Sequence, residues 1–194
     1  MRMRPLIGLV LLACTTVARP AASQNAGNPE RKVLFLYSLL QHVRWPADAF
    51  QNPDEPLRLY LIGRDPFGGA LDRYMADRTV DRRRIVVTHE TNAVAAPLPH
   101  VAFISADEEP RLPGLLAAYC RAPVLTVSDL DRFANRGGMI GLVEGGVFEL
   151  IEDDHAVHFT LNRTAAYQAR VQVGPELLHL TYPLFSSVSP CGTQ

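Results

Sequence analysis

Segments of strand-like composition alternate with segments of helical pattern between residues 57 and 134, and this alternation limits the folds open to the chain. Short runs rich in apolar or β-branched residues predict strands at 57–63, 84–88, 101–105 and 124–127. Helices are predicted at 68–76, 107–119 and 129–134. Such alternation is typical of a largely parallel sheet that carries helices on both faces.

The two flanks of this region complete the predicted fold. Apolar residues recur at helical spacing over 33–43, and the helix is expected to end before Trp45-Pro46, because a residue that precedes proline avoids the α region. Residues 147–151 and 157–161 predict a hairpin through 152–154, and a terminal helix is expected from 164 to 178. We therefore expect a single-domain α/β protein with an open, mostly parallel sheet and an antiparallel edge hairpin.

The N-terminus has the pattern of an export signal. Arg2 and Arg4 precede an apolar run over 6–13, which is far too short to span a bilayer as a permanent helix. Two cleavage schemes fit the residues that follow. The run that ends at Cys14 resembles a lipobox, which would remove residues 1–13 and lipidate Cys14, whereas cleavage after Ser23 would remove a signal peptide at 1–23. Both schemes place the mature protein outside the cytoplasm, in the periplasm.

Composition indicates one soluble-type domain of acidic character. With 47% hydrophobic residues over the full chain, there is enough apolar material for the segment 31–182 to build one substantial core, and 183–194 is expected to be a tail. Removing residues 1–23 takes away three arginines and no acidic residue, which leaves 16 basic and 20 acidic residues and a net charge of −4. A mildly acidic domain argues against nucleic acid as a partner. The run Arg82-Arg83-Arg84 is interpreted as a solvated turn.

No catalytic pattern emerges from the sequence, and we expect neither an enzyme nor a bound cofactor. The stretch 63–69, GRDPFGG, lies where a phosphate loop would lie, yet it matches neither G-x-G-x-x-G nor the Walker pattern and has no lysine. This stretch and Gly137-Gly138 are interpreted as tight turns. His155 and His158 would point to opposite faces of a strand, so a metal site is not predicted.

Cysteine usage fits an oxidising compartment. Apart from Cys14, the chain has Cys120 and Cys191, an even number outside the export signal. A bridge between them would hold the C-terminal tail against the segment before the strand at 124–127. The alternative is two separate thiols, because the sequence gives no distance between them.

A series of short motifs resembles the YfiR family. The motifs stand in the family's order over residues 31–180: KVLFLY at 32–37 with RWP at 44–46, LRL at 57–59, GRDPFG at 63–68, VAFI at 101–104, VLTVSD at 124–129, Phe133 with GGMIGL at 137–142, and LN at 161–162 before an Ala/Arg-rich helix. Each motif alone has little specificity, but together and in order they are specific to the family.

The resemblance implies a periplasmic regulatory protein. In the family's best-known system, the protein binds the periplasmic sensor part of an inner-membrane diguanylate cyclase and represses it, which lowers cyclic-di-GMP and disfavours biofilm. The resemblance implies the same role here, and also a homodimer, which members of the family tend to form. Many members carry cysteines where this chain has Tyr60 and Pro99. Redox control through that pair is therefore not expected here.

Candidate partner contacts are Arg64, Asp65, Phe67 and Met139. Arg64 and Asp65 have the alternative of pairing within their own turn, and Phe67 and Met139 that of plain core residues. A second function remains open, a periplasmic small-molecule-binding protein, because the turn at 63–69 follows a strand's carboxyl end, where open α/β sheets place ligands. In that case Arg64 or Asp65 would face a pocket.

Overall fold

The computed structural model describes residues 29–91, 97–142, 159–178, 181, 182, 189 and 191. Helices in these ranges are α1 (Pro29–Gln41), α2 (Ala70–Met75), α3 (Leu112–Tyr119), α4 (Arg163–Gln168) and α5 (Pro175–Leu178). Shorter 3-10 helices are η1 (Ala47–Ala49), η2 (Ala106–Arg111) and η3 (Phe133–Arg136). The predicted helix at 107–119 is thus divided into η2 and α3, and Pro113 stands in the first turn of α3, where its missing N–H does no harm.

Eight of the described strands form one sheet in the order β10-β8-β7-β6-β5-β2-β4-β3. Their bounds are β2 (Leu57–Ile62), β3 (Thr79–Val80), β4 (Arg83–Glu90), β5 (Val101–Ile104), β6 (Leu125–Ser128), β7 (Ile140–Leu142), β8 (Phe159–Leu161) and β10 (Thr181–Tyr182). The five strands β4, β2, β5, β6 and β7 are parallel, and β8 runs antiparallel to β7. The predicted α/β fold with an antiparallel edge is confirmed. The first strand of the predicted hairpin, at 147–151, lies outside the described residues.

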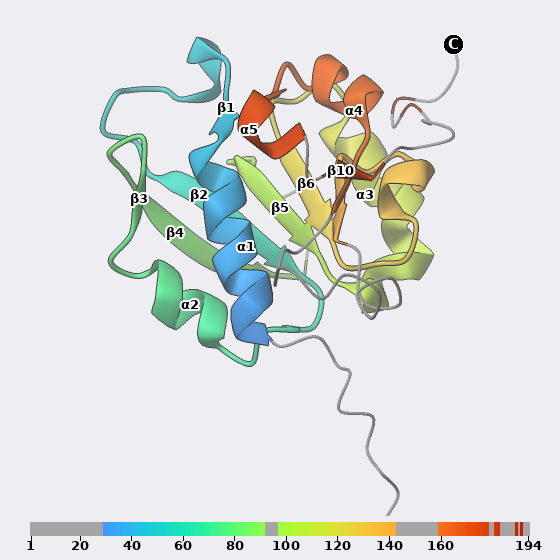
Figure 1. The fold of residues 1–194 in the computed structure, drawn as a ribbon, viewed down its shortest axis with the longest axis horizontal. Helices are drawn as coiled ribbons and strands as arrows, with labels where there is room; N and C mark the ends of the chain where they lie inside the picture. The colour runs from blue at the N-terminus through green and yellow to red at the C-terminus, as the bar shows by residue number, and fades with distance from the viewer. Residues whose placement is uncertain are drawn as a thin grey trace, which may run out of the picture.

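Both faces of the sheet are covered, and the period of two along its strands explains why. Leu57, Leu59 and Leu61 of β2 face a core shared with α1 and α2, whereas Tyr60 and Ile62 face a second core shared with α3. Helix α1 lies along the near side of the sheet in Figure 1, with α2 beside it. Successive side chains of the central strands enter the two cores in turn. Both kinds of position are therefore apolar, and the sequence of each strand is a nearly continuous apolar run.

The C-terminal helix predicted at 164–178 is wrong. Helix α4 ends at Gln168, Arg170 adopts a left-handed φ of 57°, and the chain then forms β9 (Gln172–Val173). This strand pairs antiparallel with β1 (Val43–Arg44). The helix predicted at 33–43 therefore ends earlier, at Gln41, and Val43 belongs to a strand. Pairing between residues so far apart in sequence overrides a local helical pattern. Helix α5 then restarts at Pro175, a residue well suited to a first helical position.

Candidate functional site

The carboxyl edge of the parallel strands contains the point at which ligands bind in many open α/β sheets. Strand β2 lies between β4 and β5, and the connections that leave β2 and β5 go to opposite faces of the sheet, through α2 and α3. In sheets of this order the diverging connections open a crevice between the two strand ends. The segments that follow β2 and β5 are therefore the first place to look for a site.

In this protein the crevice is closed by contacts between its own two loops. The backbone N–H of Arg64 donates to both carboxylate oxygens of Asp107, at 3.1 and 3.2 Å, and the buried Ser105 hydroxyl donates to the Arg64 carbonyl at 2.6 Å. Gly63 has a φ of 92°, and a Cβ there would lie 2.7 Å from the Cγ of Glu108. A glycine is thus required at this close approach of the two loops.

Two further backbone donors of the loop at 63–69, those of Phe67 and Gly69, are also occupied. Asp65 accepts the backbone N–H of Phe67 at 2.7 Å with one carboxylate oxygen, and the N–H of Gly69 at 2.6 Å with the other. A phosphate loop needs such N–H groups free for the ligand. Here the chain's own carboxylates take that place, which agrees with the interpretation as a tight turn and speaks against an anion site at this loop.

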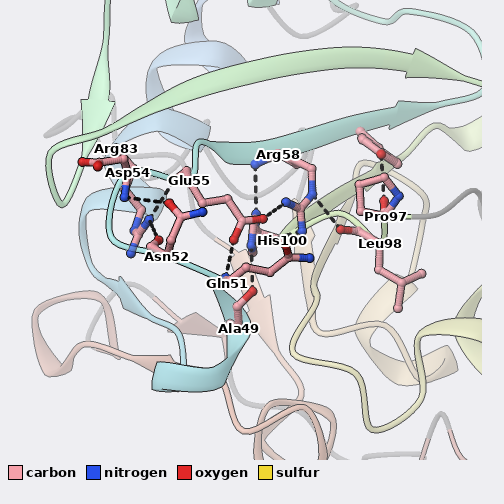
Figure 2. Close-up of polar contacts among 11 residues, drawn as sticks. Ala49, Gln51, Asn52, Asp54, Glu55, Arg58, Arg83, Pro97, Leu98 and His100 are labelled. Atoms are coloured by element: carbon pink, nitrogen blue, oxygen red, sulfur yellow. Dashed lines mark hydrogen bonds and ion pairs between the residues drawn. The ribbon is translucent and has the colours of Figure 1, made fainter.

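A second polar cluster, centred on His100, ties the loop after β1 to the sheet (Figure 2). His100 is 1% exposed, and its Nδ1 accepts the backbone N–H of Arg58 at 3.0 Å while its Nε2 lies 3.0 Å from the Ala49 carbonyl, to which it donates. The ring stacks on Phe50 with centroids 4.1 Å apart, and the His100 carbonyl accepts the indole N–H of Trp45 at 3.1 Å. Both ring nitrogens are engaged, so this histidine holds the loop in place rather than being free to transfer a proton.

Charged groups surround this histidine. Arg58 forms an ion pair with the largely buried Glu55 and donates from Nε to the Leu98 carbonyl at 2.9 Å. Arg83 donates to the carbonyls of Asn52 and Glu55, at 3.0 and 2.7 Å, and its guanidinium lies 3.8 Å from the centre of the Phe50 ring. The arginine run at 82–84 is therefore not simply a solvated turn: Asp81 and Arg82 make the turn, whereas Arg83 begins β4 and binds the loop.

The environment of His100 disfavours its charged form. Burial, and after it the neighbouring Arg58 guanidinium, lowers the pKa of the imidazole to about 4 from 6.5. Burial pushes the pKa of Glu55 upward, but the backbone N–H of Gln51 and the side chain of Arg58 more than offset this, so that its pKa is lowered from 4.5. The cluster accordingly holds a neutral histidine and an ionised glutamate at neutral pH.

Comparison with known proteins identifies the family. A family model described as YfiR/HmsC-like matches residues 30–181, which includes the parallel sheet, both cores and the cluster around His100. The chain belongs to the YfiR/HmsC-like family. No curated protein sequence matches it.

Membership in the YfiR/HmsC-like family supports, in general terms, a periplasmic regulator of diguanylate cyclase, and this family is regulatory rather than catalytic. Within the described ranges, no helix is long and apolar enough to cross a membrane. In the same part of the chain, no group of three or more histidine, cysteine or acidic side chains is arranged so that it could hold a metal ion.

The residues proposed from the sequence as partner contacts of this YfiR-like chain fall into two groups. Phe67 and Met139 are 2% and 1% exposed and belong to the core, as the alternative interpretation had it, so they offer a partner no surface. Asp65 is half-buried and engaged in its own turn. Arg64 is exposed, and its guanidinium makes no hydrogen bond or ion pair within the described part of the chain. Arg64 alone has a side chain available for contact.

The two cysteines outside the export signal are joined. A disulfide links Cys120 and Cys191, with Cα atoms 5.2 Å apart, and attaches a point of the tail to the end of α3. Cys191 also donates its backbone N–H to the Ser189 hydroxyl at 3.1 Å. Cys14 and both candidate cleavage positions lie outside the described residues.

Proposed function

We propose that this chain binds the periplasmic sensor part of an inner-membrane diguanylate cyclase and represses the cyclase, thereby lowering cyclic-di-GMP and disfavouring biofilm. The observation that carries the proposal is the match of residues 30–181 to the YfiR/HmsC-like family. The contacts between the two loops at the ends of β2 and β5 add to it, since Asp107 and Asp65 already engage the N–H groups of Arg64 and Gly69, which a small anionic ligand would otherwise use.

Repression by a bound protein requires that it prefer one state of the sensor. A binder shifts an equilibrium only by the difference in its affinity for the two states. A tenfold drop in the ratio of active to inactive sensor therefore needs a difference of about 1.4 kcal/mol in binding free energy. One or two well-placed contacts, such as an ion pair made by the unoccupied guanidinium of Arg64, are of this order.

The proposal includes export to the periplasm, through cleavage after Ser23 or through lipidation of Cys14, and a homodimeric state. The two cleavage schemes differ in outcome, because a lipidated chain would stay on a membrane face and a cleaved one would be free. Mass spectrometry of the mature N-terminus distinguishes them, and light scattering of the purified domain measures the oligomeric state.

The partner is tested by affinity capture from solubilised membranes, with tagged residues 24–194 as bait and mass spectrometry as readout. The proposal predicts recovery of a membrane protein that carries a cytoplasmic diguanylate cyclase domain. Replacing Arg64 with alanine should weaken recovery, whereas the same change at the exposed Arg73 of α2 should not. Repeated capture by folded bait without any cyclase-domain protein would refute the proposed function.

A further inference from the structure

Two hollows share the segment Arg44-Trp45-Pro46 in their lining. The first has a volume of about 540 Å³ and lies between this segment, β9 and α4, and the second, of about 350 Å³, lies between the same segment and the β3–β4 turn. Figure 1 shows β1, α4 and α5 at the same end of the molecule. Leu161, Ala166 and Val171 contribute apolar surface to the first hollow. The first hollow is mainly apolar and the second is mixed. Hollows of this size that combine apolar surface with a few polar groups are the usual form of a binding site.

Positive charge dominates the margins of both hollows. Arg44, Arg163 and Arg170 line the first, and Arg44 and Arg83 line the second. Carboxylates oppose only part of this charge. Arg170 pairs with Asp48 at 2.9 Å, and Arg44 lies 3.6 Å from Asp81. Arg163 is exposed and has neither a hydrogen bond nor an ion pair among the described residues. This local excess of arginine contrasts with the acidic character of the rest of the chain.

The aromatic residues of the same surface are those that dominate binding energy in protein interfaces. Tyr167 is 86% exposed and stands four residues after Arg163, which places the two side chains on one face of α4. Trp45 lines both hollows, and Phe50 lines the second. Tryptophan, tyrosine and arginine are enriched among the few residues that carry most of the affinity of an interface.

Contacts with the rest of the protein hold the backbone of β1 and β9 and the side chain of Trp45 in place. The backbone of Val43 and Arg44 pairs with that of Gln172 and Val173, and the indole N–H of Trp45 is held by the His100 carbonyl. Arg163 begins α4, where the helix dipole disfavours a cation, so its charge does not serve the stability of that helix. A rigid surface with an unneutralised cation and an exposed aromatic ring is suited to binding rather than to folding.

We propose that this surface, defined by Trp45, Arg163, Tyr167 and Arg170 with the two hollows beside them, is where an acidic segment of the cyclase's periplasmic part docks. The inference rests on the proposed function. An extended peptide segment that passes over Trp45 fits better than a small molecule, because it can place an apolar side chain in the first hollow while its carboxylates reach the arginines that line both. Charge complementarity then gives specificity for an acidic segment. Burial of the aromatic rings against that segment gives most of the affinity.

The test uses the capture experiment with matched variants of tagged residues 24–194. Arg163→Glu reverses the unpaired charge and Tyr167→Ala removes the exposed ring. As the control, Arg73→Glu reverses an exposed charge on α2, which Figure 1 shows at the opposite end of the molecule from β1 and α4. The first two variants should fold normally, because both side chains are exposed and a glutamate is favoured at the start of a helix. Circular dichroism and the urea unfolding curve verify this for each bait before capture.

We expect the cyclase recovered by wild type to fall at least tenfold with Arg163→Glu and with Tyr167→Ala, and to be unchanged with Arg73→Glu. Equal recovery by wild type and both surface variants would overturn the docking site and leave the proposed function intact. If Arg73→Glu lowered the recovery of the cyclase as much as Arg163→Glu, the effect would come from the net charge of the bait. That result would also overturn the docking site. If wild type itself recovers no cyclase, the proposed function fails and this inference falls with it.

Discussion

Between pH 7 and pH 4, acid should weaken this fold mainly through His100. Its ring nitrogens accept the Arg58 N–H and donate to the Ala49 carbonyl, and burial together with the Arg58 guanidinium lowers its pKa to about 4. In the unfolded chain the imidazole has an ordinary pKa of 6.5. Between these two values the unfolded state binds a proton that the folded state does not. The free energy of unfolding therefore falls as the pH drops from 7 to 4.

The magnitude follows from the two pKa values of His100. A tenfold difference in proton affinity is worth about 1.4 kcal/mol, so a pKa of about 4 in place of 6.5 corresponds to roughly 3 kcal/mol, lost between pH 7 and pH 4. Such a loss is a large fraction of the 5–15 kcal/mol that typically holds a domain together. Glu55 acts in the same direction but at lower pH, because its lowered pKa places its contribution below an unfolded value of 4.5.

The assay is urea unfolding at pH 7.0, 6.0 and 4.5, followed by fluorescence. Trp45 is the only tryptophan of the chain and donates to the His100 carbonyl, so its emission reports on the loop that the histidine holds. The comparison is His100→Gln, which keeps an amide able to donate to the Ala49 carbonyl and does not titrate. We expect the variant to be less stable at pH 7 and to lose much less stability on acidification. Parallel pH curves for wild type and variant would refute the reasoning.

Two further perturbations have matched controls. Reducing the Cys120–Cys191 disulfide, which closes a loop of 71 residues, should lower the unfolding free energy by about 2–4 kcal/mol, and a Cys120→Ser/Cys191→Ser variant should lose the same amount without responding to reductant. Unchanged stability under reductant would contradict this. Gly138→Ala should destabilise by about 2 kcal/mol or more, because its Cβ would lie 2.1 Å from the Phe133 ring, whereas Gly114→Ala, with open space around its Cβ in α3, should be neutral or slightly stabilising. Urea unfolding of both variants checks this pair, and similar effects would contradict it.

The local sequence pattern predicted most of the helices and strands, because the spacing of apolar residues within a short segment indicates which of the two it forms. The strands β2, β4, β5 and β6 and the helix α2 lie where apolar runs and turn residues placed them. The helix predicted at 129–134 is wrong, because Arg132 adopts a left-handed φ of 55° and only the 3-10 helix η3 follows it. The failure nearer the C-terminus was decided over long distances. The helix expected at 164–178 gives way to β9, since Val43 and Arg44 offer a pairing partner that no local window contains.

The candidate sites show the same division. Arg64 could be predicted as a residue of a turn after a strand. The even number of cysteines outside the export signal allowed a bridge, and only the structure distinguishes it from two separate thiols. His100 could not be recognised, because its partners stand 42 and 51 residues away and nothing beside it in the sequence marks it as buried. The arginine-lined hollows were missed for a related reason: they join β1, α4 and β9, whose proximity depends on the strand pairing that the sequence did not reveal.

Cellular cyclic-di-GMP tests the central claim most directly. The measurement compares the native host with a strain that lacks this gene and with one complemented by the exported wild-type chain, grown where the chain is expressed. If the chain represses a diguanylate cyclase, the nucleotide rises when the gene is removed and returns to its original level on complementation. An unchanged or lower level in the deletion strain, with the captured cyclase still present in its membranes, would contradict the account.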